Sequence, residues 1–159
     1  MLLGLLTALL VAIIDQLSKF IMIYHVLADY GAIIITPFFA FVRAWNTGVS
    51  FSMFNNWGIN GVYILSALAM LIVAALLKWL KTEQSRIMQV ALGMIIGGAL
   101  GNVIDRIRLG AVFDFLDFSV GQYHWPAFNA ADSFICIGAG LIILHSLLQG
   151  RKNKHKEKF

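Results

Sequence analysis

The sequence predicts an all-α polytopic membrane protein with four transmembrane helices. Of its 159 residues, 60% are hydrophobic and 13% are charged, and the mean hydropathy is +0.82. Soluble domains are typically ~45–50% apolar and ~25% charged. Four apolar stretches, each with roughly the ~20 residues that a bilayer core requires, lie at about 2–24, 58–77, 87–104 and 131–148. The length suits a single membrane-embedded domain that covers residues 1–159.

Positive charge predicts the orientation of these helices. Eight of the twelve Lys and Arg residues lie in segment 78–86 or in the basic tail 149–159. The positive-inside rule assigns both segments to the cytoplasmic side. We therefore expect both termini inside and segments 25–57 and 105–130 outside. The first stretch lacks a basic n-region and a small-residue cleavage site, so it does not resemble a removable signal peptide.

The basic tail also bears on the class of partner. Such a tail can indicate nucleic-acid binding, but next to an apolar helix it is more often a cytoplasmic membrane flank. We therefore expect membrane lipids around the chain and no nucleic-acid partner.

Segment 25–57 differs from the apolar stretches. Residues 33–41 mix β-branched and aromatic side chains around a proline, and residues 41–45 alternate, which favours short strands. Asn46-Thr47-Gly48 is a turn pattern. The aromatic residues of 51–57 are of the kind enriched at membrane interfaces.

Two features of the apolar stretches predict helix packing. Gly93, Gly97 and Gly101 recur every fourth residue, and small residues at this spacing let helix backbones approach closely. Gly101 is placed to make room for a substrate backbone as well. Asp15 and Lys19 stand four residues apart, on one face of a helix, and are expected to form a structural ion pair.

Asp114 and Asp132 are the main candidates for chemistry. Both lie beside or on segments long enough to cross a membrane, where ionisable groups are expensive and the default interpretation is functional. Two carboxylates held close together cannot both ionise easily, so they share a proton. An ionised carboxylate can then take a proton from water while a protonated one donates to an amide carbonyl oxygen. The residues alone do not indicate which of the two is protonated at rest.

A structural alternative remains open for both residues. Asp132 precedes an apolar run and fits a helix N-cap, and either Asp could pair with an Arg. Asp117 is interpreted as structural, and Asp105 or Asp117 could tune the pair.

No metal or other cofactor is expected. Neither Asp114 nor Asp132 has a His or Cys neighbour at metal-ligand spacing, and His124 is isolated between them. The single cysteine, Cys136, lies in an apolar run, so no disulfide framework exists within the chain. We expect Cys136 to be a small buried hydrophobe.

Four further polar residues are candidates for substrate binding. The side-chain amides of Asn46, Asn102 and Asn129 can donate and accept at once, which suits an extended peptide backbone. Arg106 is a fixed cation suited to a carbonyl cluster or a carboxylate. Its structural alternative is an ion pair with Asp105 or with another acid of segment 105–130.

Taken in order, these blocks resemble the lipoprotein signal peptidases (signal peptidase II), which are bacterial aspartyl intramembrane peptidases. The resemblance covers nearly the whole chain, and its order and spacing are highly specific. The matching stretches are Asp15-Gln16-Leu17-Ser18-Lys19, Asn46-Thr47-Gly48 with Phe51, Gly97 to Asn102 with Asp105-Arg106, Gly110 with Val112-Phe113-Asp114-Phe115, and Phe128-Asn129-Ala130-Ala131-Asp132.

The resemblance implies an activity and roles for residues. Such enzymes remove the signal peptide from a prolipoprotein by cutting before a lipobox cysteine that carries a diacylglyceryl group. The motif match makes Asp114 and Asp132 the catalytic dyad. It places the remaining residues at the substrate site (Asn46, Asn102, Arg106, Asn129) or in a supporting pair (Asp15, Lys19).

The resemblance also implies a fold, a location and an inhibitor class. The family fold is four transmembrane helices with a small periplasmic β-sheet cradle and a short periplasmic amphipathic helix. The protein is expected in the bacterial cytoplasmic (inner) membrane, with its active site near the periplasmic face. Cyclic peptide antibiotics such as globomycin block the family's dyad.

Three rival functions are weighed against a peptidase. A small proton-coupled transporter predicts Asp residues deep in the spans, yet only Asp15 is inside one, and paired discontinuous helices are absent from the pattern. A non-catalytic scaffold predicts no loss of lipoprotein maturation when both Asp residues are changed. A metal-dependent lipid phosphotransferase would need several Asp residues on one helix face.

Overall fold

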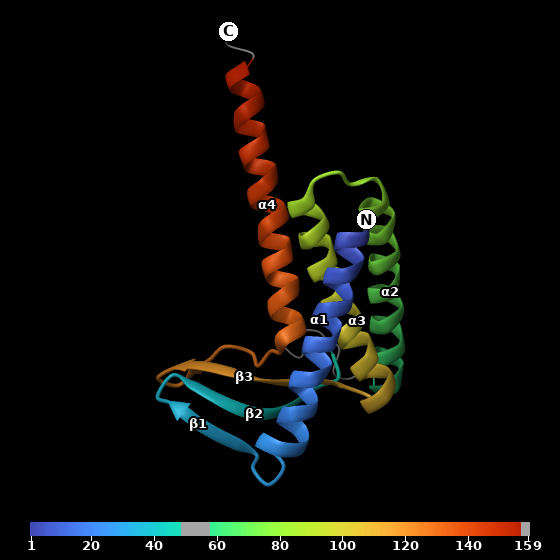
Figure 1. Ribbon diagram of the computed structural model, residues 1–159. Helices are drawn as coiled ribbons and strands as arrows, with labels where there is room; N and C mark the ends of the chain where they lie inside the picture. Colours follow the sequence, from blue (N-terminus) through green and yellow to red (C-terminus); the bar gives the residue numbers. More distant parts are fainter. Residues whose placement is uncertain (49–57, 157–159) are drawn as a thin grey trace.

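The computed structural model describes residues 1–48 and 58–156 of the chain. Four long helices lie side by side, and a small sheet projects sideways from one end of them (Figure 1). The elements are α1 (Leu2–Ile21) with a π-helical turn (Met22–Val26), β1 (Ala32–Thr36), β2 (Phe39–Asn46), α2 (Gly58–Thr82), α3 (Arg86–Leu109), β3 (Val112–Val120), β4 (Tyr123–His124) and α4 (Ala130–Lys156). The two termini and the α2–α3 turn lie at the end opposite the sheet (Figure 1).

Four helices are long and apolar enough to cross a membrane, which confirms that part of the predicted fold. The candidate spans are Leu2–Val26, Gly61–Thr82, Arg86–Leu109 and Ala130–Gln149. The second and third run five residues past their predicted ends. Charged residues do not terminate them, because such residues can point beyond the apolar core while the backbone remains helical.

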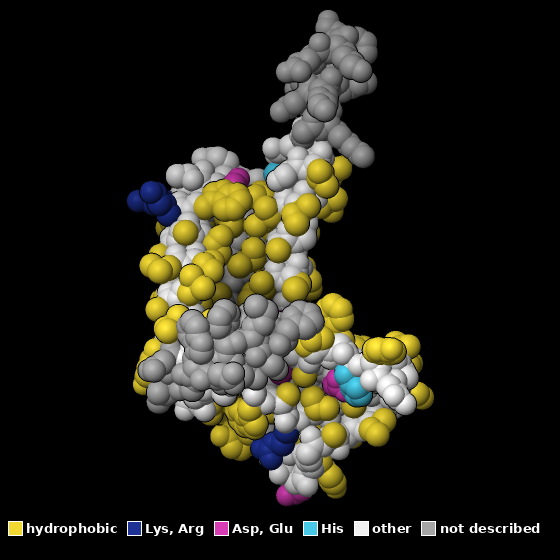
Figure 2. Space-filling view, turned by 180° about the vertical axis from the view of Figure 1, so that it is seen from behind, with side chains coloured by type: hydrophobic (Ala, Val, Ile, Leu, Met, Phe, Trp, Pro, Cys, Tyr) yellow, Lys and Arg dark blue, Asp and Glu magenta, His cyan; other side chains and the backbone are white. Residues whose placement is uncertain are grey.

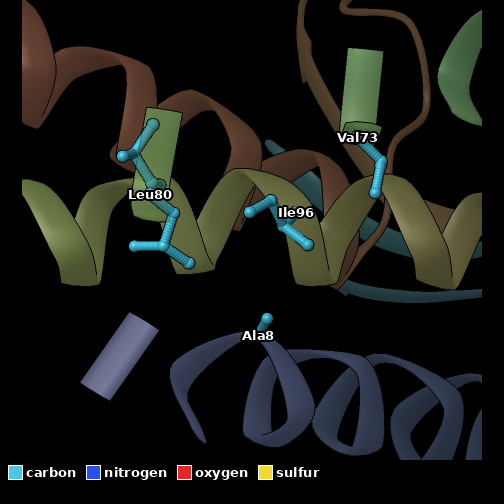
Figure 3. Close-up of a cluster of buried hydrophobic side chains, with 5 residues drawn as sticks. Ala8, Val73, Leu80 and Ile96 are labelled. Atoms are coloured by element: carbon cyan, nitrogen blue, oxygen red, sulfur yellow. The ribbon is translucent and has the colours of Figure 1, made fainter. Parts of the chain in front are cut away.

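Helix α3 is the centre of the bundle and packs against α1, α2 and α4. A Cβ on Gly97 would collide with the backbone of Ala8 in α1, and one on Gly98 would meet the carbonyl of Ala131 in α4 at 2.6 Å. The predicted close packing through small residues is therefore present on two faces of α3. On a third side, α3 contributes Ile96 to a buried apolar cluster with residues of α1 and α2 (Figure 3).

The predicted third stretch ended at residue 104, whereas α3 continues to Leu109, and the contacts at its end explain the difference. Asp105 and Arg106 belong to its last turns rather than to a polar loop. Asp105 is neutralised by Lys19 at 2.7 Å, and basic side chains are favourable near a helix C-terminus. Gly110 then ends the helix with φ of 74°, a left-handed conformation that glycine adopts without strain.

The sheet is antiparallel, in the order β1-β2-β3-β4. The strands predicted between residues 33 and 45 are confirmed as β1 and β2. The turn predicted at Asn46 is also present, since the N–H of Gly48 donates to Oδ1 of Asn46 at 3.1 Å. Segment 105–130, for which the residue pattern predicted no strand, contains β3 and β4. The first four residues of β3 are all buried, so the polar alternation of a half-exposed strand is missing.

Large apolar side chains cover the outside of the helices (Figure 2), as expected of surfaces that face lipid. Cys136 is also exposed, on α4. The expectation that it is buried was wrong, because an apolar run in a spanning helix faces lipid as readily as protein. The aromatic stretch 51–57, predicted to be interfacial, and the implied short amphipathic helix lie outside the described residues.

Candidate active site

Asp114 lies on β3, where strand pairing brings it beside Asn46. Ala44 of β2 pairs with Asp114, and Asn46 pairs with Val112 two residues earlier. The side chains of Asn46 and Asp114 are therefore diagonal neighbours on one face of the sheet. Nδ2 of Asn46 donates to Oδ2 of Asp114 at 3.1 Å, and Asp114 is only 2% exposed.

Asp132 lies in the first turn of α4, and Asn129 caps this helix. Oδ1 of Asn129 accepts from the N–H of Asp132 at 3.0 Å, and Oδ2 of Asp132 accepts from the N–H of Asn129 at 3.2 Å. This reciprocal pattern is a capping box with Asn and Asp in its two positions. The alternative that Asp132 is the N-cap is therefore wrong, and its carboxylate is turned back over the start of the helix.

Asn129 joins the two candidate carboxylates. Its Nδ2 donates to Oδ1 of Asp114 at 2.6 Å, while its backbone N–H holds Asp132. Asn102 of α3 completes the arrangement. Its Nδ2 donates to Oδ1 of Asp132 at 2.9 Å, and its Oδ1 accepts from Nδ2 of Asn129 at 3.2 Å. Two acids that are 18 positions apart in the sequence thus share one buried anchor.

A buried cationic centre supports this arrangement from α1. Nζ of Lys19 contacts Oδ2 of Asp15 at 2.9 Å, Oδ2 of Asp105 at 2.7 Å and Oδ1 of Asn102 at 3.0 Å. The predicted ion pair of Asp15 and Lys19 is present. Asp105 was left undecided by the sequence, and its place directly after an apolar stretch was the available indication of a buried partner.

The same cluster ties four elements together. Oδ1 of Asp15 accepts from the backbone N–H of Ala131 in α4 at 2.9 Å. The carboxylate of Asp105 accepts from Gln16 at 2.8 Å and from the N–H of Phe113 in β3 at 3.3 Å. A Cβ on Gly101 would collide with the carboxylate of Asp15. The space beside Gly101 is therefore occupied by Asp15, and the expectation that it is left for a substrate backbone was wrong.

Arg106 lies on the same side of α3 as the dyad. One guanidinium nitrogen donates to the carbonyl oxygen of Gly48 at 3.2 Å, and the charges of Asp132 and Asp114 act on it. Its alternative partner, Asp105, is bound by Lys19 instead. Its buried Nε has no hydrogen-bond partner within residues 1–48 and 58–156.

Burial and, to a smaller extent, the nearby charge of Asp132 raise the pKa of Asp114 to about 7. The amide donors of Asn46 and Asn129 and the charge of Lys19 oppose this shift because they favour the ionised carboxylate. Burial outweighs them. Asp114 can therefore hold a proton near neutral pH.

The other two ionisable residues considered in segment 105–130, Asp117 and His124, pair with each other rather than with the dyad. Asp117 pairs with Nδ1 of His124 at 2.9 Å, and the His124 side chain is 61% exposed. Within the part of the chain that the structure describes, no group of three or more His, Cys, Asp or Glu residues could hold a metal ion.

Comparison with known proteins places this constellation in a family. The family model for signal peptidase (SPase) II matches residues 7–148. The chain belongs to the signal peptidase II family. A lipoprotein signal peptidase from Alteromonas mediterranea is 42% identical over 146 residues, which cover 91% of this chain and 80% of that protein. One from Aeromonas hydrophila is 42% identical over 147 residues, covering 91% and 88%.

Solved structures agree with the family assignment. A structure described as a bacterial membrane enzyme at 2.3 Å resolution superposes with a TM-score of 0.79 at 33% identity, covering 95% of this chain and 90% of that one. A second, at 1.9 Å, gives a TM-score of 0.73 at 32% identity. As a member of the signal peptidase II family, the chain is an aspartic-type endopeptidase with multiple membrane spans rather than a transporter or a scaffold.

Proposed function

We propose that this enzyme removes the signal peptide from diacylglyceryl-modified prolipoproteins and cuts before the lipidated lipobox cysteine. The family and the names of its relatives support prolipoproteins as the substrate. The observation that carries the mechanism is the placement of Asp114 and Asp132 on one buried anchor, Asn129.

The two carboxylates have different surroundings, which supports different roles. Asp114 has a pKa of about 7, raised by burial, so it can hold a proton near neutral pH. Asp132 accepts from Nδ2 of Asn102 and from the N–H of Asn129 at the start of α4, where a negative charge is favoured. Asp114 is therefore the general acid and Asp132 the general base.

The reaction then balances without a covalent intermediate. The oxygen of a water molecule bonds to the scissile carbonyl carbon, one water proton passes to Asp132, and the Asp114 proton passes to the carbonyl oxygen. The resulting diol collapses, the C–N bond breaks, and the leaving amine takes the proton from Asp132. A diol proton returns to Asp114 and restores the resting state.

The amides that the resemblance assigns to substrate binding are here engaged with the dyad. We propose that Asn102 and Asn129 first orient the two carboxylates and that Asn46 sets the protonation of Asp114. The guanidinium of Arg106 is suited to a substrate carbonyl beside the dyad, because it carries donors in a rigid fork and a permanent charge. Asp15 and Lys19 act as structural support.

The fold and the charge pattern support a proposal for the level of the site in the membrane. The dyad lies where the sheet meets the start of α4, whereas both termini and the basic segment 78–86, around the α2–α3 turn, lie at the other end of the bundle (Figure 1). The positive-inside rule assigns that other end to the cytoplasm. We therefore place the chain in the bacterial inner membrane with the dyad near the periplasmic face. Cyclic peptide inhibitors such as globomycin are expected to bind there.

The deciding experiment replaces each acid by its amide. Asp114→Asn and Asp132→Asn should each lower cleavage of a purified diacylglyceryl prolipoprotein by about 10²–10⁴-fold, scored by the mass of the products. Asp117→Asn, also on β3 but paired with His124, is the matched control and should keep its activity. A normal rate in either dyad variant, with its thermal unfolding intact, would refute the mechanism.

A further inference from the structure

A groove opens beside Asp132 between α4 and the segment that precedes it. Its volume is about 430 Å³, within the range of small-molecule sites. The side chains that line it include Trp125, Pro126, Phe128, Asp132, Ile135 and Cys136.

The lining of the groove is mostly apolar. Asp132 contributes a carboxylate to it, and both carboxylate oxygens are already bound by Asn102 and Asn129. Ser133 also lines the groove, but its hydroxyl donates to the carbonyl of Asn129 at 3.0 Å. An occupant therefore gains hydrophobic burial here and finds few polar partners.

The groove follows the outer face of a candidate membrane span. Cys136 lies four residues beyond Asp132, about 6 Å along α4, and is exposed. Ile137 and Ile143 further along α4 are also more than half exposed, and only 11% of the span's apolar window is buried. The groove thus runs from the dyad toward the surface that lipid would cover.

The volume of the groove restricts which apolar group can occupy it. A helix with its side chains is about 10–12 Å wide and rises about 5.4 Å per turn, so about 430 Å³ corresponds to roughly one turn. A signal peptide's apolar helix is several turns long and does not fit. A single extended hydrocarbon chain does.

We infer that this groove binds one acyl chain of the diacylglyceryl group on the substrate cysteine. The inference rests on the proposed function, because that cysteine adjoins the bond cut at the dyad. Covalent attachment gives its acyl chain a high effective concentration at the groove's mouth, which a free membrane lipid lacks.

A bulky side chain introduced into the groove tests the binding of the acyl chain directly. Cys136→Trp fills the groove, and Ile137→Trp adds the same bulk to the neighbouring exposed position outside it. The substrates are lipobox peptides whose cysteine carries two butanoyl or two hexadecanoyl chains. In the wild type, kcat/KM should be higher for the hexadecanoyl peptide. Cys136→Trp should lower that value about tenfold or more and leave the butanoyl value within about threefold, whereas Ile137→Trp should preserve the chain-length preference.

A second measurement uses the native thiol and needs no variant. The chain has one cysteine, so N-ethylmaleimide labelling followed by mass reports Cys136 alone. Lipobox peptides with an N-methylated scissile amide are added at concentrations that fully inhibit the enzyme. The hexadecanoyl analogue should slow labelling about tenfold, and a butanoyl analogue less, because only the longer chain reaches past Cys136.

The outcomes distinguish a failure of the groove proposal from a failure of the proposed catalytic dyad. Equal effects of Cys136→Trp on both chain lengths, with no protection of Cys136, would overturn the groove while leaving cleavage by Asp114 and Asp132 intact. Protection by an unlipidated peptide would assign the groove to a signal-peptide side chain. Protection by phosphatidylglycerol vesicles without any peptide would assign it to a membrane lipid. Either result overturns the inference.

Discussion

The ammonium group of Lys19 donates to Oδ1 of Asn102 at 3.0 Å, and this contact fixes which way the Asn102 amide points. With its oxygen held by a cation, Asn102 turns its NH₂ group toward Asp132, to which it donates at 2.9 Å. Lys19 in α1 therefore orients the carboxylate of Asp132 in α4 through the side-chain amide of Asn102. The dyad's geometry depends on residues that need not touch the substrate.

Replacing Lys19 by Met should destabilise the fold strongly. Lys19 is the cation between the buried carboxylates of Asp15 and Asp105, and removing one partner of a buried ion pair is expected to cost about 3–5 kcal/mol. Thermal unfolding in detergent measures the effect. Lys78→Met, at an exposed position on α2, should change stability by less than about 0.5 kcal/mol. Adding Asp105→Asn to Lys19→Met should recover part of the loss, and a double variant no more stable than the single one would contradict this account.

Asn129 should prove more important for activity than for helix capping. Asn129→Ala removes the α4 cap, and Ser85→Ala removes the α3 cap, whose side chain accepts from the N–H of Met88. Each is expected to lose about 0.5–2 kcal/mol of stability, but only Asn129→Ala should lose peptidase activity. Asn129→Ser preserves capping ability yet lacks the amide donor to Asp114, so it should be stable and inactive. An active Asn129→Ser variant would show that this donor is dispensable.

The pH dependence of the reaction should report Asp114. Because the general acid must be protonated and burial raises its pKa to about 7, kcat should fall about tenfold per pH unit above that value. Asn46 opposes the shift by donating to the ionised carboxylate. Asn46→Leu should therefore raise the pKa and move the alkaline limb to higher pH. Asp117→Asn is the control. If Asn46→Leu leaves the alkaline limb of the kcat–pH profile in place, or moves it to lower pH, the assignment of Asp114 as general acid is refuted.

Gly101 should tolerate no side chain. A Cβ there collides with the carboxylate of Asp15, so Gly101→Ala should push α1 away from α3, lower the unfolding temperature and disturb the dyad through Lys19. Gly140 on α4 has open space around it, and Gly140→Ala should be neutral or raise stability by up to about 1 kcal/mol. Equal unfolding temperatures for the two variants would mean that the packing at Gly101 is not tight.

Local patterns were enough to predict the four membrane-capable helices and the strands of segment 25–57. Apolar length, small-residue spacing and alternation each act within a few residues of the chain. The same patterns missed β3, because a strand buried on both faces lacks alternation. They also ended α3 too early, because the neutralisation of Asp105 depends on Lys19, 86 residues earlier.

The sequence by itself determined that the chain lies in a membrane, which residues can carry acid–base chemistry, and which pairs stand on one helix face. Only the tertiary structure decided that Asn129 holds Asp114 and Asp132 together and that Asp15 fills the space beside Gly101. It also decided that Cys136 faces outward. The reason is physical: composition and periodicity describe one element at a time, whereas contacts and burial depend on which elements pack together.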